Sequence, residues 1–176
     1  HYYTWTVPNN ISDHCLLKVV DYDNSCRNDI SDAEFRITPP SPVITVTAPN
    51  SATTLYFTKT STISWTSQYL TSPFVTIEYT YDNGLTWNSI ANATENDGSY
   101  GWTVPETPST QCQVRISEYQ NPSVNDISNV NFSIAYPYII VTSPNGGEIF
   151  EGCETTTISW TRAGVSNSYK LEYSSN

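Results

Sequence analysis

Histidines are few in this chain, and its frequent carboxylates form no recognisable catalytic arrangement in the sequence. The histidines are His1 and His14, and neither belongs to a Ser/His/Asp or Cys/His arrangement of the kind that a nucleophilic hydrolase uses. Zinc would need more histidine or cysteine at ligand spacing, and no pair of carboxylates stands out as the acid and nucleophile of a glycosidase. We therefore expect a protein that is not an enzyme.

One oxygen-rich segment contains the residue types that bind calcium. Asp21, Asp23 and Asp29 lie close together in the sequence, with Asn24 and Asn28 between them. Calcium takes roughly six to eight oxygen ligands, which such a loop can supply. However, the EF-hand spacing is absent, and carboxylates at loop tips are usually only hydrated, so a solvated turn is the favoured alternative. We expect no cofactor, with calcium at these three aspartates as the one candidate.

The segment 80–87, TYDNGLTW, resembles the Asp-box pattern S/T-x-D-x-G-x-T-W of sialidases and many β-propellers. Its Asp82-Asn83-Gly84 core predicts a tight hairpin turn, because glycine accepts a positive φ without steric cost. In those families the box is a structural hairpin remote from catalysis. We interpret the segment as an Asp-box-like hairpin, since a sialidase-like enzyme would need several more boxes at propeller spacing.

Aromatic side chains near loops are the remaining candidates for a binding role. Tyr69, Phe74, Tyr81 and Tyr119 fall at loops or at outward positions of expected strands. Flat aromatic platforms are used by sugar-binding modules. The alternative is ordinary surface decoration, because single exposed apolar residues are normal on proteins.

Charge and composition narrow the class of protein. The chain has 176 residues and a formal net charge of −10, and 14% of its residues are charged. An acidic surface repels phosphate backbones and anionic membranes, so we expect no nucleic acid partner. No apolar run approaches the length of a membrane span, so we also expect no membrane insertion. Thr, Ser, Tyr and Asn fill the polar positions, and this balance favours strands over helices.

The chain also repeats itself at a fixed spacing, which is typical of an array architecture. The sequence 3–8 returns at 100–105, and Cys15 matches Cys112 (112 − 15 = 97). A second match places Trp65 on Trp160 (160 − 65 = 95). These offsets predict three units: the C-terminal half of a repeat over 1–42, a complete repeat over 43–138, and the N-terminal half of a further repeat over 139–176.

Alternating β-branched and aromatic residues recur between turn signals, and no stretch has a helical period. Seven short strands in a unit of this size predict an all-β fold, namely tandem β-sandwich repeats of immunoglobulin or fibronectin type III. The expected strands of the complete repeat are 43–48, 61–67, 73–81, 85–90, 98–104, 111–119 and 130–136. The residues expected to face a core are Cys112, Val114 and Ile116 with their equivalents Cys15, Leu17 and Val19, and Ile63 and Trp65 with their equivalents Ile158 and Trp160.

Neither terminal half can cover its own apolar face, and both leave open sheet edges. The rest of each unit lies outside this sequence, or the halves are loosely ordered, or the front half of one molecule completes the back half of another in head-to-tail self-association. In that last case Cys15 and Cys153 become neighbours and are a candidate disulfide. Cys112 has Thr58 at the corresponding position, which predicts a free, buried thiol.

Taken together, the motifs resemble the immunoglobulin- or fibronectin-like repeats in large secreted and cell-surface proteins of Bacteroidetes-type bacteria. A related pattern occurs in the Ser/Thr-rich cell-wall domains of the yeast Knh type. The resemblance covers essentially the whole chain and is clearest at 140–148, IVTSPNGGE, whereas the complete repeat lacks both glycines at 48–53. Its other motifs are T-I-S-W-T, L-E-Y-S, Y-x-W-T-V-P and C-x-V-R-I.

This resemblance implies surface display, adhesion or the spacing of other modules, and it transfers no catalytic residues. We expect a non-catalytic structural or adhesive segment of an extracellular or cell-surface bacterial protein, acting as a spacer or stalk. The alternative is a carbohydrate-binding accessory module of a secreted polysaccharide-degrading enzyme. The expected partners are neighbouring repeats of the same protein and a surface glycan or a host or cell-surface protein.

Overall fold

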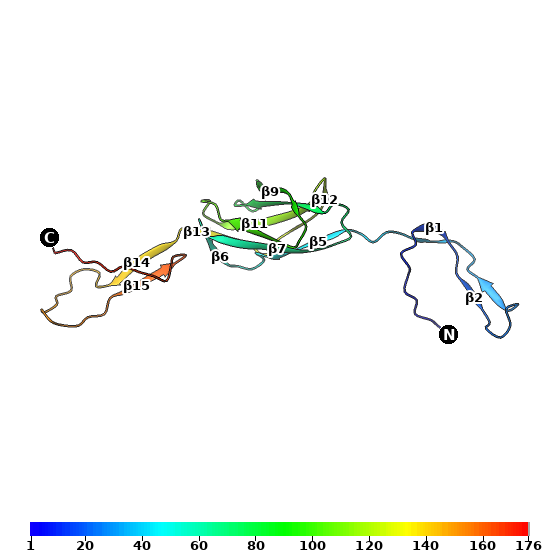
Figure 1. Cartoon of the computed structure of the whole chain (residues 1–176), viewed down its shortest axis with the longest axis horizontal. Coiled ribbons are helices and arrows are strands. Elements are labelled where there is room, and N and C mark those ends of the chain that lie inside the picture. The colour runs from blue at the N-terminus through cyan, green and yellow to red at the C-terminus, as the bar shows by residue number, and fades with distance from the viewer. Residues whose placement is uncertain (176) are drawn as a thin grey trace. The chain divides into compact units, whose positions relative to one another are not determined.

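The structure, a computed structural model, describes residues 1–175, and none of these residues lies in a helix. This confirms the all-β prediction. The chain divides into two compact units, the first covering His1–Ser41 and the second beginning at Pro42 (Figure 1). No helix in the described part of the chain is long and apolar enough to cross a membrane.

The first unit, called the N-terminal segment (1–41), contains two short antiparallel strand pairs. Strand β1 (Ser12–Cys15) pairs with β4 (Phe35–Ile37), and β2 (Lys18–Val20) pairs with β3 (Asn28–Ile30). The ring of Trp5 packs edge-on against Phe35, with the ring centroids 6.2 Å apart. Leu17 and Val19, which the sequence pattern directs toward a core, are exposed.

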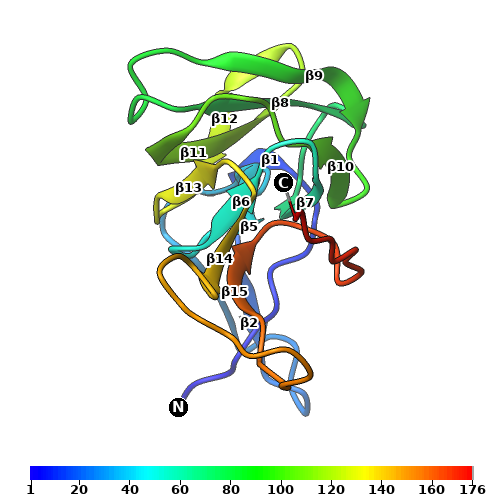
Figure 2. The same ribbon diagram turned by 90° about the vertical axis from the view of Figure 1, so that its left-hand side faces the viewer.

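Residues 43–135, called the middle sandwich, form two sheets that lie face to face, as Figure 2 shows for β8, β9 and β11 above β5 and β7. The smaller sheet has the order β10-β7-β5, all antiparallel. Its strands are β5 (Val43–Ala48), β7 (Thr60–Gln68) and β10 (Ser99–Thr103).

The larger sheet has the order β6-β13-β11-β8-β9, and β12 pairs with the second half of β11. Strand β6 runs parallel to β13, and the other pairs are antiparallel. The strands are β6 (Thr54–Tyr56), β8 (Phe74–Thr80), β9 (Asn88–Glu95), β11 (Ser109–Glu118), β12 (Asn121–Ile127) and β13 (Phe132–Ala135). Strands β6 and β12 were not expected from the sequence, and β9 lies later than the expected strand 85–90.

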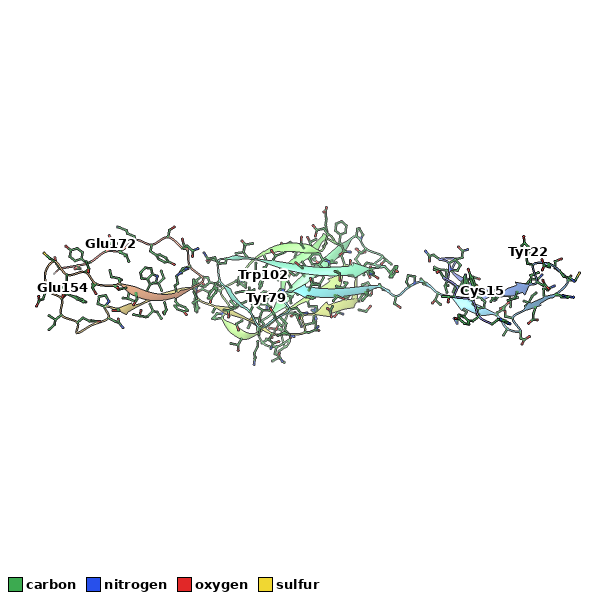
Figure 3. All side chains as sticks on the ribbon, turned by 90° about the horizontal axis from the view of Figure 1, so that it is seen from below. Cys15, Tyr22, Tyr79, Trp102, Glu154 and Glu172 are labelled. Atoms are coloured by element: carbon green, nitrogen blue, oxygen red, sulfur yellow. The ribbon has the colours of Figure 1, made fainter. Side chains whose placement is uncertain are left out.

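The core of the middle sandwich consists of the inward side chains of both sheets. Tyr79 and Trp102 pack together with ring centroids 5.3 Å apart (Figure 3). The ring of Trp102 also meets that of Phe132 edge-on. The predicted inward residues of this unit are all buried. The buried apolar residues are Ile44, Val46, Ile63, Trp65, Val75, Ile77, Tyr79, Trp102, Val104, Cys112, Val114, Ile116, Phe132 and Ile134.

The part of the chain after the middle sandwich, called the C-terminal segment (138–175), contains one hairpin-like pair. Strand β14 (Tyr138–Ser143) pairs with β15 (Ser159–Ala163). The ring of Trp160 packs against Tyr169 at 5.1 Å between centroids. Trp160 is half-buried and Ile158 is exposed, so this segment does not enclose them as the middle sandwich encloses Trp65 and Ile63.

Pairs of residues that face each other across strands recur at the same spacings, 97 and 95, as the sequence repeats. Cys15 opposes Phe35 in β1–β4, and Cys112 opposes Phe132 in β11–β13, both partners being shifted by 97. In the same way, Val141 opposes Trp160 and Val46 opposes Trp65, both shifted by 95. The terminal segments therefore build the same local pairings that the middle sandwich contains.

Candidate functional site

A pocket that gathers polar and aromatic groups lies at one end of the larger sheet. Its volume is about 540 Å³, and it is lined by residues 71–74, which lead into β8, and by residues 119–121, the turn between β11 and β12. Pro73 and Phe74 give it an apolar wall. Thr71, Asn121 and the backbone of the turn give it polar groups.

A buried carboxylate beneath the pocket holds both loops in place. Glu118, at the end of β11, is almost completely buried. Its Oε1 accepts hydrogen bonds from the Thr71 hydroxyl at 2.8 Å and from the Ser72 backbone N–H at 2.8 Å, as well as from the Thr71 N–H. Its Oε2 accepts from Asn121 Nδ2 at 3.0 Å. One side chain thus connects the loop before β8 to the β11–β12 turn.

The electrostatics of Glu118 fit this structural role. Burial disfavours the charged carboxylate, but the hydrogen bonds from Ser72, Thr71 and Asn121 outweigh it and lower the pKa of Glu118. The group is therefore ionised at neutral pH and accepts hydrogen bonds only. A carboxylate whose oxygens are all engaged in this way organises the loops and is not poised for proton transfer.

Aromatic rings at the pocket rim come from two elements that are distant in sequence. The ring of Phe74 meets that of Tyr119 edge-on, with centroids 6.5 Å apart. Tyr119 N–H donates to the Phe74 carbonyl at 3.1 Å, which fixes the two residues relative to each other. Gln120 has a φ of 68°, so the turn projects its side chain from a left-handed backbone conformation. Apolar ring faces beside amide groups suit a ligand with both C–H and O–H surfaces, such as a sugar.

Of the four aromatic residues that the sequence singles out, two lie in this pocket. Tyr69 and Tyr81 are exposed but do not line it. Tyr81 instead lies near Tyr79, at 6.4 Å between ring centroids. The structure therefore brings together Phe74 and Tyr119 and leaves Tyr69 and Tyr81 apart from them.

The three calcium candidates are not gathered into one ligand set. Asp21 follows β2, where its Oδ1 accepts from the Asp23 N–H at 3.0 Å and its Oδ2 lies 3.5 Å from Arg27 Nη1. Asp29 lies on β3, opposite Val19. Within residues 1–175, no group of three His, Cys, Asp or Glu side chains is placed to share a metal ion.

The four cysteines are free thiols in the structure. Cys112 is buried, and burial raises the pKa of its thiol. Cys26 and Cys153 are exposed. Cys15 belongs to the first unit and Cys153 to the second, so their pairing stays a prediction.

The Asp-box-like segment forms a tight turn between β8 and β9. The Asp82 carboxylate accepts from the Thr80 hydroxyl at 2.6 Å, from the Thr86 N–H at 2.8 Å and from the Thr86 hydroxyl at 2.5 Å. These hydrogen bonds, that from Thr80 first, lower the pKa of Asp82 to about 2. Next to the turn, the Arg115 guanidinium lies 4.3 Å from the centroid of the Trp87 ring. The segment acts as a turn, and its carboxylate is engaged in holding it.

Glu118 is a residue of this site that was not predicted from the sequence. It continues the inward parity of Cys112, Val114 and Ile116 on β11, so the alternation itself places a carboxylate on the buried face. A charged residue at a core position needs hydrogen-bonding partners. The carboxylate at an inward position of this strand is therefore the sequence signal that could have identified Glu118. Its partners at 71–72 lie in a loop whose position only the folded sheet defines.

Comparisons with protein-family models, with curated protein sequences and with solved structures gave no match to this chain.

Proposed function

We propose that this chain is a non-catalytic segment of tandem immunoglobulin- or fibronectin-like β-sandwich repeats in an extracellular or cell-surface protein, where it acts as a spacer or stalk with an adhesive role. The observation that carries the proposal is the recurrence of strand pairing at constant offsets, with Val141 opposite Trp160 as Val46 is opposite Trp65. When one module is repeated in series, each module contacts only its neighbours and the length of the protein grows with the number of modules. Such an array is suited to act as a spacer.

The chemistry of the buried and turn carboxylates supports a non-catalytic role. Glu118 and Asp82 have lowered pKa values because their oxygens accept hydrogen bonds from nearby backbone and hydroxyl groups. A general acid or base would instead need a pKa near the working pH. Both groups stabilise loops, as expected of a module whose function is to keep its shape.

Two experiments test the proposed role. Antibodies raised against the chain should label intact cells that produce the parent protein, and labelling only after the cells are made permeable would contradict an extracellular location. Stretching the chain between its ends should show one discrete event when the middle sandwich unfolds, releasing about 300 Å of polypeptide. A smooth extension without this event would contradict a mechanically resistant spacer.

The Phe74–Tyr119 pocket favours a second candidate function, a carbohydrate-binding accessory module. Two aromatic rings, neighbouring amide groups and a carboxylate that fixes both loops form a shaped and polar-rimmed pocket. A glycan array probed with the whole chain tests it. Tyr119→Ala should abolish any binding found, whereas Tyr81→Ala, which removes an exposed tyrosine outside the pocket, should leave it unchanged. Equal binding by both variants would exclude the pocket.

A further inference from the structure

The two outer strands of the smaller sheet differ in what covers them. At one edge, the Val46 N–H of β5 donates to the Asp126 carboxylate of β12 at 2.7 Å, so the larger sheet reaches across to β5. At the other edge, β10 pairs with β7 alone among the strands of the described chain. The sandwich is therefore joined along β5 and open along β10, which lies at the right in Figure 2.

The open edge of β10 carries backbone groups that can pair with another strand. Val104, directly after β10, donates its N–H to the Lys59 carbonyl at 3.0 Å and accepts from the Thr58 N–H at 3.1 Å, so its backbone groups face the β7 side. Alternate residues of a strand point their N–H and C=O groups to opposite sides. Gly101 and Thr103 therefore direct theirs away from β7. An edge of this kind is a template for the addition of a strand.

Strand β10 lacks the features that normally protect an open edge. Proteins commonly place lysine, proline or a bulge on such a strand. Residues 99–103 are Ser-Tyr-Gly-Trp-Thr, and their register with β7 is unbroken. Gly101, in the middle of the strand, is exposed, and a Cβ atom there would meet only the Thr60 methyl group, at 3.9 Å. Another backbone can therefore approach this strand closely.

Beside this edge lies a groove of about 410 Å³ between β10 and β9. Tyr79 and Trp102 form its floor, and the partly buried Ile90 and Tyr100 line its walls. Asn88 lies directly opposite Tyr79 on β9, so its side chain lies on the same inward face. Its Nδ2 is buried and has no hydrogen-bond partner within residues 1–175. The groove therefore offers apolar surface to incoming side chains, with an unused donor beside it.

Carboxylates at both ends of β10 select the charge of the segment that pairs with it. Asp97 precedes the strand and Glu106 follows it, and both are exposed. Lys59 lies on the β7 side, away from the open edge. A second copy of β10, paired in antiparallel fashion about Gly101, would bring Asp97 of one chain near Glu106 of the other, and like charges across a strand pair are destabilising. The charges therefore favour a segment with lysine or arginine at both ends.

We propose that the open edge of β10 binds an extended peptide segment of a partner protein, which adds a fourth strand to the three-stranded sheet. The segment has apolar side chains at alternate positions, which enter the groove, and a lysine or arginine at each end. Main-chain hydrogen bonds to Gly101 and Thr103 supply affinity, and the groove and the two carboxylates supply specificity. The inference concerns residues 43–135 alone and does not depend on the repeat organisation.

A peptide array probed with the labelled whole chain tests the proposal. The peptides have about nine residues, the spacing of Asp97 and Glu106 (106 − 97 = 9). Valine, leucine or isoleucine alternates with threonine at the inner positions, and both ends carry either lysine or glutamate. Lysine-ended peptides should bind, and glutamate-ended peptides of the same inner sequence should bind roughly tenfold more weakly. Asp97→Asn together with Glu106→Gln should remove this preference.

Two variants at one position separate backbone pairing from general contact. Gly101→Pro removes the outward N–H and should keep the fold, because proline is tolerated on an edge strand whose N–H faces solvent. It should weaken binding of the best lysine-ended peptide by roughly tenfold, since a main-chain hydrogen bond is lost. Gly101→Ala keeps the N–H and adds only an ordinary contact, so it should bind like the unmodified chain. Thermal melts of both variants check that they are folded.

A change in the peptide gives the same test without altering the protein. Only alternate backbone nitrogens of an added strand face β10. Of two peptides methylated on alternate sets of backbone nitrogens, one should therefore lose binding and the other should keep it. The Asn88 side-chain amide signal in nuclear magnetic resonance spectra should shift when the peptide binds, because this group lies beside the groove.

Several results would overturn the inference. These are an array on which no lysine-ended peptide binds, equal binding by folded Gly101→Pro and Gly101→Ala, and tighter binding of glutamate-ended peptides. In sedimentation velocity, a two-chain mass that Gly101→Pro reduces to one chain would show that the edge pairs with a second copy instead. None of these results bears on the surface labelling and stretching experiments, so failure of the inference and failure of the proposed function are distinguishable.

Discussion

Removal of the Glu118 carboxylate should destabilise the middle sandwich more than any other change to its pocket. The side chain is buried, and it accepts hydrogen bonds from the Thr71 N–H and hydroxyl, the Ser72 N–H and the Asn121 amide. Glu118→Ala leaves these donors without their acceptor, and each buried unsatisfied donor costs about 1–3 kcal/mol. Because solvent reaches part of the loop in the variant, we expect a total loss of about 3–5 kcal/mol in the free energy of unfolding.

Two further variants divide this free energy among its causes. Glu118→Gln keeps one acceptor oxygen but turns an amide N–H₂ toward the Asn121 donor, so it should cost about 2 kcal/mol. Asn121→Ala removes one donor and leaves the carboxylate its other partners, so it should cost about 1 kcal/mol. Urea unfolding followed by the fluorescence of the buried tryptophans Trp65 and Trp102 measures all three. A loss below about 1 kcal/mol for Glu118→Ala would refute the view that this carboxylate holds the loops.

The pH dependence of stability gives an independent check on Glu118. Its folded-state pKa is lowered, so the unfolded state binds the proton more tightly and folding is favoured above the ordinary glutamate pKa. This contribution should be lost as the pH falls through the lowered folded-state pKa. Glu118→Gln should therefore flatten the acid limb of the stability curve, and an unchanged slope would contradict the assignment.

Three other predictions concern the Asp82 turn, the calcium candidates and the cysteines. Asp82→Asn should lower the thermal midpoint of the middle sandwich, because the Thr86 N–H and hydroxyl bond to different carboxylate oxygens and an amide N–H₂ replaces one of them. An unchanged midpoint in a thermal melt would count against the turn's role. Millimolar calcium should not raise the melting temperature, since Asp21 already engages Arg27 and no three carboxylates of the described residues are placed to share an ion. A clear rise that a chelator reverses would reinstate the metal site. A thiol reagent should label the exposed Cys26 rapidly and the buried Cys112 only on unfolding, as mass spectrometry of digested samples would show. Rapid labelling of Cys112 would mean that the core is open.

The features that the sequence predicts well are those governed by side-chain alternation. Strand β5 matches its expected range, and the inward residues of β7 and β11 are buried because period-two alternation defines a face wherever the opposite sheet is present. The same alternation predicts that Leu17 and Val19 face a core, and this is wrong for the described chain, where both side chains are exposed because no second sheet covers them.

The features that the sequence does not reveal depend on partners far along the chain. Strand β6 has only three residues and exists through its parallel pairing with β13. Strand β12, Asn121–Ile127, contains a proline and lacks clear alternation, so its pairing with β11 defines it. The pocket was only half predicted, because pattern reasoning selects exposed aromatics one by one whereas the contact of Phe74 with Tyr119 arises from the sheet.

Cross-strand proton contacts measured by nuclear magnetic resonance on the whole chain test most directly whether one sandwich module is copied in series. The account predicts contacts between Val141 and Trp160 that match those between Val46 and Trp65, and contacts between Cys15 and Phe35 that match those between Cys112 and Phe132. Terminal segments with other strand partners, or with no strand pairing at all, would contradict it.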